Sequence, residues 1–276
     1  MLFEQLAKLE VADKREYDAL AQVTQHPRRP RPKREADQIY MLPGSQLHQA
    51  KLMAPYLAAK SVVFVGDGDC MALSILALAR ARVIAPDQVP NHILVLDFDD
   101  RLVTFINELA VEWKLSDQLE AHYYNVADVI PSHFQSKHDV FYVNPPYGSK
   151  NEGFSAVAFI ARGIELCTTH HSRGVAILPY EPTREWTQSA MYRVQQFLIS
   201  NGFVVSEMLT RMHAYHLDDR PELQSGTLVA DKVVENSHNN PLAGRAITES
   251  ELTNFYGAGV STFPRGINAA GDFTWE

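Results

Sequence analysis

The sequence predicts an α/β fold with a mostly parallel sheet that is covered by helices on both faces. From residue 45 onward, short apolar runs alternate with longer segments in which apolar residues recur every three or four positions. Such alternation is typical of strand–helix–strand units with right-handed crossovers. The length of 276 residues, of which 46% are hydrophobic, suits one large domain with extensions or two small domains.

The first 44 residues are expected to form an N-terminal extension. Apolar residues at roughly helical spacing over residues 2–24 predict one or two short helices. Residues 26–34 follow with three prolines and five positive charges, which predict an extended linker. These charges could contact phosphates, but a solvated linker without a ligand is the favoured interpretation, as it is for most runs of charge.

Residues 45–235 are expected to form the α/β domain itself. Helices are predicted over residues 46–57, 71–82 and 101–113. Strands are predicted over residues 61–65, 92–96, 121–125, 139–143, 174–178 and 203–209, with a last, antiparallel strand over 226–230. Residues 236–276 are rich in Asn, Gly, Thr and Ser and form a C-terminal extension to which the pattern assigns no element.

The charge balance argues against a surface built for nucleic acid. The chain has 25 Lys and Arg residues against 33 Asp and Glu residues, which gives a formal net charge of -8. An acidic surface does not attract a polyanion, and nucleic-acid binding draws most of its affinity from the neutralisation of phosphates. The charge instead favours a cationic small molecule as the ligand.

Nothing in the sequence indicates secretion or a membrane. Cys70 and Cys167 have no paired spacing, which argues against a disulfide framework and against a zinc site built from cysteines. Residues 1–16 carry acidic residues early and predict an amphipathic helix rather than a signal peptide. No apolar run approaches the roughly 20 residues that span a bilayer. We expect a soluble cytoplasmic protein without a bound metal.

The loop after the first predicted strand is the first candidate for a binding site. It contains Gly66, Asp67, Gly68 and Asp69. Glycines after a buried strand let the backbone pass close to a ligand, and the following helix offers free N–H groups. The two acidic residues would repel a pyrophosphate but suit the sulfonium and ammonium groups of an adenosylmethionine-type cofactor. A plain turn between strand and helix is the competing interpretation.

Polar residues also follow the second and third predicted strands. Asp97, followed by Phe98, ends the second strand, where an acidic residue can accept both ribose hydroxyls of an adenosyl cofactor. Asp99 and Asp100 are expected to cap the next helix instead. Asn125 follows the third strand, and its amide can pair with the edge of an adenine, although Asn is equally common in turns.

The strongest motif is the tetrapeptide Asn144-Pro145-Pro146-Tyr147, which follows the fourth predicted strand. The Asn144 side-chain oxygen and the Pro145 carbonyl can each accept an N–H of an acceptor amine, which moves the nitrogen towards an attacking geometry. The two prolines stiffen the turn and hold that carbonyl in place. Tyr147 offers a stacking face for a planar substrate or a cation–π face for an ammonium. A rigid turn without chemistry is the competing interpretation.

Two weaker groups of candidates lie further along the chain. Tyr180 and Glu181 end the fifth predicted strand and could line a pocket for the acceptor. His213 and Tyr215 belong to a segment with further His and Asp residues. Two His residues without a third ligand are poor grounds for a metal site, so a polar rim around the acceptor, or an exposed loop, is favoured.

The order of these motifs resembles the catalytic domain of the branched-chain polyamine synthases, the N4-bis(aminopropyl)spermidine synthase family. The similarity runs from about Asp37 to Asp219 and includes the Gly66–Asp69 loop, Leu96–Leu102 and the tetrapeptide at Asn144. The resemblance implies a class I adenosylmethionine-type Rossmann-like fold with a seven-stranded, mostly parallel sheet. It also implies transfer of aminopropyl groups from decarboxylated S-adenosylmethionine to a polyamine nitrogen.

The chain departs from this family at the tetrapeptide. The family usually has Asp-Pro-Pro-Glu where this chain has Asn144-Pro145-Pro146-Tyr147, so two carboxylates that would hold a polycation are absent. The replacement is similar to the tetrapeptide of methyltransferases that act on adenine N6, cytosine N4 or glutamine. The N-terminal region is also short compared with a full auxiliary domain.

Three functions are consistent with these motifs. We expect an S-adenosylmethionine-dependent N-methyltransferase whose acceptor is the exocyclic amine of a nucleobase, either adenine N6 or cytosine N4. The alternative is an aminopropyltransferase that uses decarboxylated S-adenosylmethionine and a polyamine. A non-catalytic partner subunit is the third, because a fold alone does not prove activity. Whether the protein forms a homodimer or needs a partner subunit for target recognition stays open.

Overall fold

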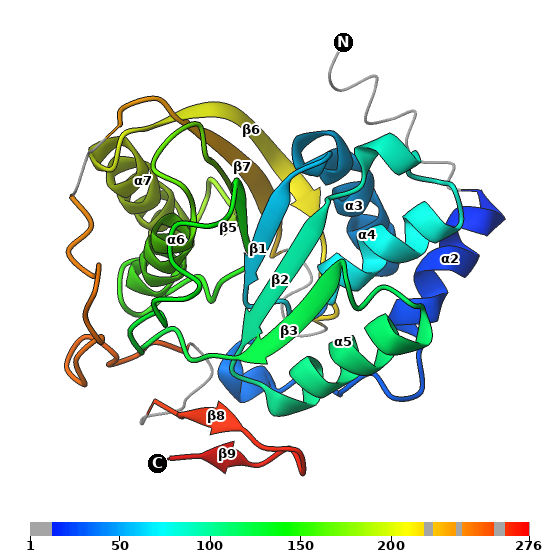
Figure 1. Ribbon diagram of the computed structural model, residues 1–276. Helices are drawn as coiled ribbons and strands as arrows, with labels where there is room; N and C mark the ends of the chain where they lie inside the picture. The colour runs from blue at the N-terminus through cyan, green and yellow to red at the C-terminus, as the bar shows by residue number, and fades with distance from the viewer. Residues whose placement is uncertain (1–12, 218–222, 236–238, 257–262, 276) are drawn as a thin grey trace.

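The computed structural model describes residues 13–217, 223–235, 239–256 and 263–275. Their main feature is a seven-stranded sheet in the order β3-β2-β1-β4-β5-β7-β6 (Figure 1). The strands are β1 (Ser61–Val65), β2 (His92–Asp97), β3 (Leu119–Tyr123), β4 (Val140–Val143), β5 (Arg173–Pro179), β6 (Phe203–His213) and β7 (Ser225–Lys232). Strands β1 to β5 are parallel, and β7 pairs antiparallel with β5 and β6. The expected fold, with its antiparallel last strand, is confirmed.

Helices cover both faces of the sheet (Figure 1). One face carries α2 (Lys14–Thr24), α3 (Pro43–Leu57), α4 (Met71–Arg80) and α5 (Asp100–Glu112), and the other carries α6 (Phe154–Leu166) and α7 (Glu185–Ser200). Two short 3-10 helices, η1 (Arg34–Ala36) and η2 (Pro86–Gln88), lie in connecting segments.

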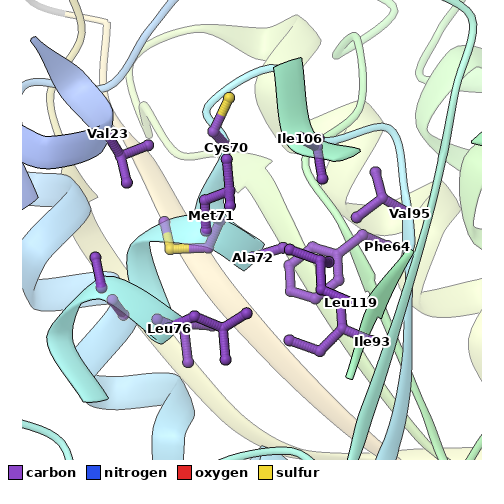
Figure 2. Packing of buried hydrophobic residues seen from close by; sticks show 14 of the residues in the cluster. Val23, Phe64, Cys70, Met71, Ala72, Leu76, Ile93, Val95, Ile106 and Leu119 are labelled. Carbon is purple, nitrogen blue, oxygen red and sulfur yellow. The ribbon is translucent and has the colours of Figure 1, made fainter. Parts of the chain in front are cut away.

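The strands contribute to a hydrophobic core on each side of the sheet. Successive side chains of a strand point to opposite faces. Val62 and Phe64 of β1 therefore lie in the core beneath α2 to α5, whereas Val63 and Val65 lie in the core beneath α6 and α7. Figure 2 shows part of the first core, where Phe64 lies among side chains of neighbouring strands and helices. Burial on both faces explains why the strands are continuous apolar runs in the sequence.

Strands β3 and β6 differ from their predicted bounds for reasons that their hydrogen bonds show. Strand β3 ends at Tyr123 rather than at residue 125, because the side chain of Asn125 accepts the N–H of Ala127 and so closes a turn. Strand β6 continues from the predicted residue 209 to His213. Its pairing with β7 contains two register shifts, which interrupt the alternation that the sequence pattern depends on.

The segment predicted to be a solvated linker lies against the sheet domain. Arg28 forms ion pairs with Glu108 and Glu112 on α5. The guanidinium of Arg29 lies 3.9 Å from the centre of the Tyr40 ring and donates to the backbone carbonyl of Asp69. The contacts of Arg29 and Tyr40 place this part of the segment at the carboxyl edge of the sheet, beside Asp69. The division of the chain at residue 44 stays a proposal, and the start of the predicted N-terminal helix lies outside the described residues.

The C-terminal extension contains a small hairpin at the same edge. Its strands β8 (Gly266–Ile267) and β9 (Phe273–Thr274) pair antiparallel. The N–H of Ile267 donates to the carbonyl of Phe98, so that the hairpin lies beside the end of β2 (Figure 1). Within the part of the chain that the structure describes, no helix is both long and apolar enough to cross a membrane.

Candidate active site

A cavity of about 260 Å³ lies at the carboxyl ends of β1, β2 and β4. The chain runs from β1 to β2 and β3 on one side and to β4 and β5 on the other, so this is the switch in strand order at which ligands of open α/β sheets bind. The expected site residues that line the cavity are Gly66, Gly68, Asp69, Asp97, Phe98, Asn144, Pro145, Pro146, Tyr147 and Tyr215. The loop after β1, the residues at the end of β2 and the tetrapeptide after β4 thus form one site.

Asp67 shapes the first loop from behind and does not line the cavity. Its carboxylate accepts the N–H groups of Met71 and Ala72 at the start of α4, at 2.7 and 3.0 Å. Complete burial raises the pKa of Asp67 well above its usual value, against the lowering effect of these two hydrogen bonds. Asp67 therefore stabilises the turn that places Gly66 and Gly68 next to the cavity.

Asp97 lies in the wall of the cavity at the end of β2. Its two carboxylate oxygens accept the backbone N–H groups of Asp67 and Asp99, each at 2.9 Å. Burial, and secondly the charge of Asp99, raise the pKa of Asp97 to about 7. Asp99 itself is fully buried, caps α5 and pairs with Arg101, as the sequence pattern predicts for a helix cap. Asp97 is thus the carboxylate of this pair that a ligand in the cavity can reach.

The side chain of Asn144 is held in one orientation by Asp69. Its Nδ2 donates to Oδ2 of Asp69 at 2.8 Å, and Oδ1 of Asp69 accepts the N–H of Met41 at 2.8 Å. Burial raises the pKa of Asp69, although these hydrogen bonds and the charge of Arg29 favour its ionised form. Because the amide N–H is bound to a carboxylate, the Asn144 oxygen is the atom that can accept a hydrogen bond from a ligand.

Tyr147 begins a chain of hydrogen bonds that runs from the cavity into the interior. Its hydroxyl lies 2.6 Å from that of Tyr215, which lies 2.6 Å from Oγ of Ser225. Ser225 bonds to Nδ1 of His213 at 2.8 Å, and Nε2 of His213 bonds to Oε1 of Gln49 at 2.8 Å. Burial lowers the pKa of His213 to about 3, so this imidazole stays neutral. His213 therefore positions Tyr215 and Tyr147 without lining the cavity.

Three other expected site residues lie outside the cavity lining. Asn125 donates from Nδ2 to the carbonyls of Pro264 and Arg265, and so holds the C-terminal extension in place. Tyr180 donates its backbone N–H to the carbonyl of Gln224. Glu181 is exposed and accepts hydrogen bonds from Thr183. An adenine contact by Asn125 and an acceptor contact by the other two are not supported by these positions.

Both chain extensions contribute residues that sequence reasoning missed. Asp37 and Tyr40 line the cavity from the segment before α3, Tyr124 and Trp186 line it from the sheet domain, and Tyr256 lines it from the C-terminal extension. The segment is held there by the Met41–Asp69 hydrogen bond and by backbone bonds that join residues 40 and 42 to residues 216 and 214. The only available signal was the family resemblance, which begins at Asp37.

Comparison with known proteins identifies the family. The model for the branched-chain polyamine synthase A C-terminal domain matches residues 18–245. The chain belongs to this family. An N(4)-bis(aminopropyl)spermidine synthase from Thermus thermophilus is 27% identical to it over 189 residues, which cover 68% of this chain and 50% of that protein. One from Methanocaldococcus jannaschii is 25% identical over 191 residues, which cover 68% of this chain and 49% of that protein. The chain thus spans about half the length of these curated relatives.

Solved structures support the same fold. The branched-chain polyamine synthase from Thermus thermophilus, in complex with N4-aminopropylspermidine and 5'-methylthioadenosine, matches with a TM-score of 0.69 and 19% identity, over 90% of this chain and 70% of that chain. A proposed RNA methyltransferase from Pyrococcus horikoshii matches with a TM-score of 0.58 and 17% identity, over 80% of this chain and 100% of that chain. At these identities the similarity shows the fold alone.

The comparisons contradict the expected N-methylation of a nucleobase. Three of the curated relatives are N(4)-bis(aminopropyl)spermidine synthases, and the polyamine synthase structure holds an aminopropylated polyamine. That expectation rested on the tetrapeptide Asn144-Pro145-Pro146-Tyr147. The expected contacts of Asn144 and Pro145 with an amine would be the same whether the amine receives a methyl or an aminopropyl group, so the motif does not identify the transferred group. The expectation of a nucleic-acid acceptor rested on the same motif and is likewise not supported.

Proposed function

We propose that this domain transfers an aminopropyl group from decarboxylated S-adenosylmethionine to an amine nitrogen of a polyamine. The observation that carries the proposal is the Asn144–Asp69 pair at the end of β4, in the cavity that also contains Asp97. This arrangement offers an acceptor for an amine N–H beside a carboxylate suited to a ribose. Membership in the polyamine synthase family supports the same chemistry.

The cavity wall suits the adenosyl group of the donor. The Asp97 carboxylate accepts backbone N–H groups and still lines the cavity, where it can also accept a ribose hydroxyl. Gly66 has a positive φ of 73°, and a Cβ on it would lie 3.0 Å from the Phe159 ring. A glycine at this point therefore keeps the backbone of the loop close to both the ring and the ligand. The donor supplies an electrophilic methylene next to a sulfonium, and transfer leaves 5'-methylthioadenosine.

The acceptor side of the cavity suits a flexible cationic amine. Among the residues that the structure describes, the lining has the carboxyl groups of Asp37, Asp69 and Asp97 against one cation, Arg34. Tyr147 and Trp186 add aromatic faces for methylene groups and for ammonium groups. The attacking nitrogen must be neutral. A primary amine can donate its two N–H groups to the Asn144 oxygen and the Pro145 carbonyl, and a secondary amine can donate its one N–H to either of them. The nitrogen lone pair then forms the new C–N bond as the C–S bond breaks, and the proton leaves the alkylated nitrogen afterwards.

The proposal is tested by incubating the purified protein with spermidine and either decarboxylated or ordinary S-adenosylmethionine. Mass spectrometry of the products should show 5'-methylthioadenosine and an aminopropylated polyamine with the decarboxylated donor only. A methylated product together with S-adenosylhomocysteine would contradict the proposal. Absence of binding to either donor in calorimetry would instead favour a non-catalytic partner subunit.

A further inference from the structure

Tyr256 is a cavity residue that lies beyond the stretch shared with the family. The family model matches residues 18–245, so Tyr256, in the C-terminal extension, lies after the match ends. The residue is only 4% exposed and lines the cavity. The extension therefore adds a side chain to the site that the family pattern does not specify.

The ring of Tyr256 is fixed by stacking. It lies nearly parallel to Phe98, with centroids 5.8 Å apart, and nearly parallel to Phe263, with centroids 5.5 Å apart. Phe98 directly follows Asp97, so the stack joins the extension to the carboxylate expected to bind ribose. Phe255 adds an edge-to-face contact to Phe263 at 5.1 Å. Such a cluster holds the Tyr256 hydroxyl in a defined place.

Hydrogen bonds tie the extension to the ends of β2 and β3. Tyr123 donates its hydroxyl to the carbonyl of Arg265 at 2.7 Å, and Arg265 pairs with Asp128. A Cβ on Gly266 would collide with the Tyr123 hydroxyl, so the glycine permits this close approach. On the other side of the stack, Ser155 donates to the carbonyl of Phe255 at 2.6 Å. The extension is thus a fixed part of the cavity wall on the side of β2 and β3.

The Tyr256 hydroxyl has no hydrogen-bond partner among the described residues. Asp97 and Asp37 lie near enough that their charges, after the larger effect of burial, raise the pKa of this hydroxyl well above its usual value. Among the described residues a few side-chain N and O atoms are enclosed without a partner, and the Tyr256 hydroxyl is not one of them, so this hydroxyl is open to the cavity. Tyr256 lines the same cavity as Asp97 and stacks on Phe98, the residue after it, so its hydroxyl is placed to donate to a ligand that Asp97 also contacts.

We propose that Tyr256 binds the nucleoside of the donor, by donating a hydrogen bond to a ribose hydroxyl that Asp97 also contacts. This inference rests on the proposed function, since it assumes an adenosyl donor in the cavity. The acceptor amine is assigned to the opposite side, where the hydroxyl of Tyr147 is already bonded to Tyr215. The C-terminal extension is thereby a component of the donor site.

The test compares Tyr256→Phe with the wild type by calorimetric titration of 5'-methylthioadenosine. The variant keeps the stacked ring and loses only the hydroxyl, so it should fold with an unchanged melting temperature and bind the nucleoside about 5- to 20-fold more weakly. The Michaelis constant for the polyamine should stay within twofold. Tyr192→Phe, at a tyrosine on α7 that is 68% exposed, is the matched control and should change neither value.

Deoxy analogues of the nucleoside identify the contact. If Tyr256 donates to a ribose hydroxyl, the difference between variant and wild type should disappear with either the 2'-deoxy or the 3'-deoxy form of 5'-methylthioadenosine. Unchanged nucleoside affinity in Tyr256→Phe, or a change in the polyamine constant alone, overturns the inference and leaves the proposed function standing. Failure of the wild-type protein to bind 5'-methylthioadenosine overturns both.

Discussion

At the residue scale, the side-chain amide of Asn144 offers one group to the protein and one to a ligand. Its Nδ2 is bound to Asp69, and its oxygen is the acceptor available to an amine in the cavity. We expect Asn144→Ala to lower kcat by about 100-fold or more, because the attacking nitrogen loses its orientation. The affinity for 5'-methylthioadenosine should stay within a few-fold, since Asp97 is untouched. Steady-state kinetics with calorimetry checks both values, and survival of turnover would show that Asn144 does not orient the amine.

We expect Asp97 to make donor binding sensitive to pH near neutrality. Burial raises its pKa to about 7, so the carboxyl group is neutral below this pH and ionised above it. An ionised carboxylate is the stronger acceptor for ribose hydroxyls. The dissociation constant of 5'-methylthioadenosine, which carries no group that titrates in this range, should therefore fall by about 3- to 10-fold between pH 6 and pH 8.

The matched variant Asp97→Ala separates this effect from titration elsewhere. It should weaken nucleoside binding at pH 8 by about 1–3 kcal/mol, because hydroxyl groups of the ligand lose their partner. The dependence of binding on pH should also become flat. A dependence that persists in the variant would assign the titration to a different group.

At the element scale, one side chain of the turn after β3 helps to hold the C-terminal extension. Asn125 is 2% exposed, donates to the carbonyls of Pro264 and Arg265, and accepts the N–H of Ala127. We expect Asn125→Ala to lower the free energy of unfolding by about 1–3 kcal/mol, because buried backbone groups lose their partners. Urea denaturation measures the change. Asn239→Ala, which removes one exposed hydrogen bond to Ser200, is the control and should cost less than 1 kcal/mol.

The elements themselves were largely predictable. A strand buried on both faces is a short apolar run, and β1 and β2 begin at the predicted residues for that reason. The segment before α3 was predicted to be a solvated linker, and this was wrong. Prolines and positive charges indicate its local conformation but not which distant residues it contacts. Arg29 lies over Tyr40 and bonds to Asp69, and no local pattern records that distant pairing. The hairpin of β8 and β9 was missed because strands of two residues have no periodicity.

At the scale of the whole molecule, packing between α6 and the sheet sets the position of β4 and therefore of Asn144. Phe141 of β4 lies against Gly163 of α6, where a Cβ would come within 2.6 Å of its ring. We expect Gly163→Ala to lower the free energy of unfolding by about 1–3 kcal/mol, because a packed ring has to move. Chemical denaturation measures the loss. Gly68→Ala, which meets no atom within 4 Å, is the control for stability and should cost less.

The sequence by itself determined the order of strands and helices, the family, and the loops that carry Gly66, Asp97 and Asn144. It did so because burial produces periodic apolar patterns and because the carboxyl ends of parallel strands meet at one edge. Only the tertiary structure decided what each polar side chain contacts. Asp67 and Asn125 stabilise turns, His213 supports Tyr147 from the interior, and Tyr256 reaches the cavity from the far end of the chain. Hydrogen bonds between residues that are distant in the sequence leave no local sequence pattern. These bonds decide which polar side chains are used within the protein and which can contact a ligand.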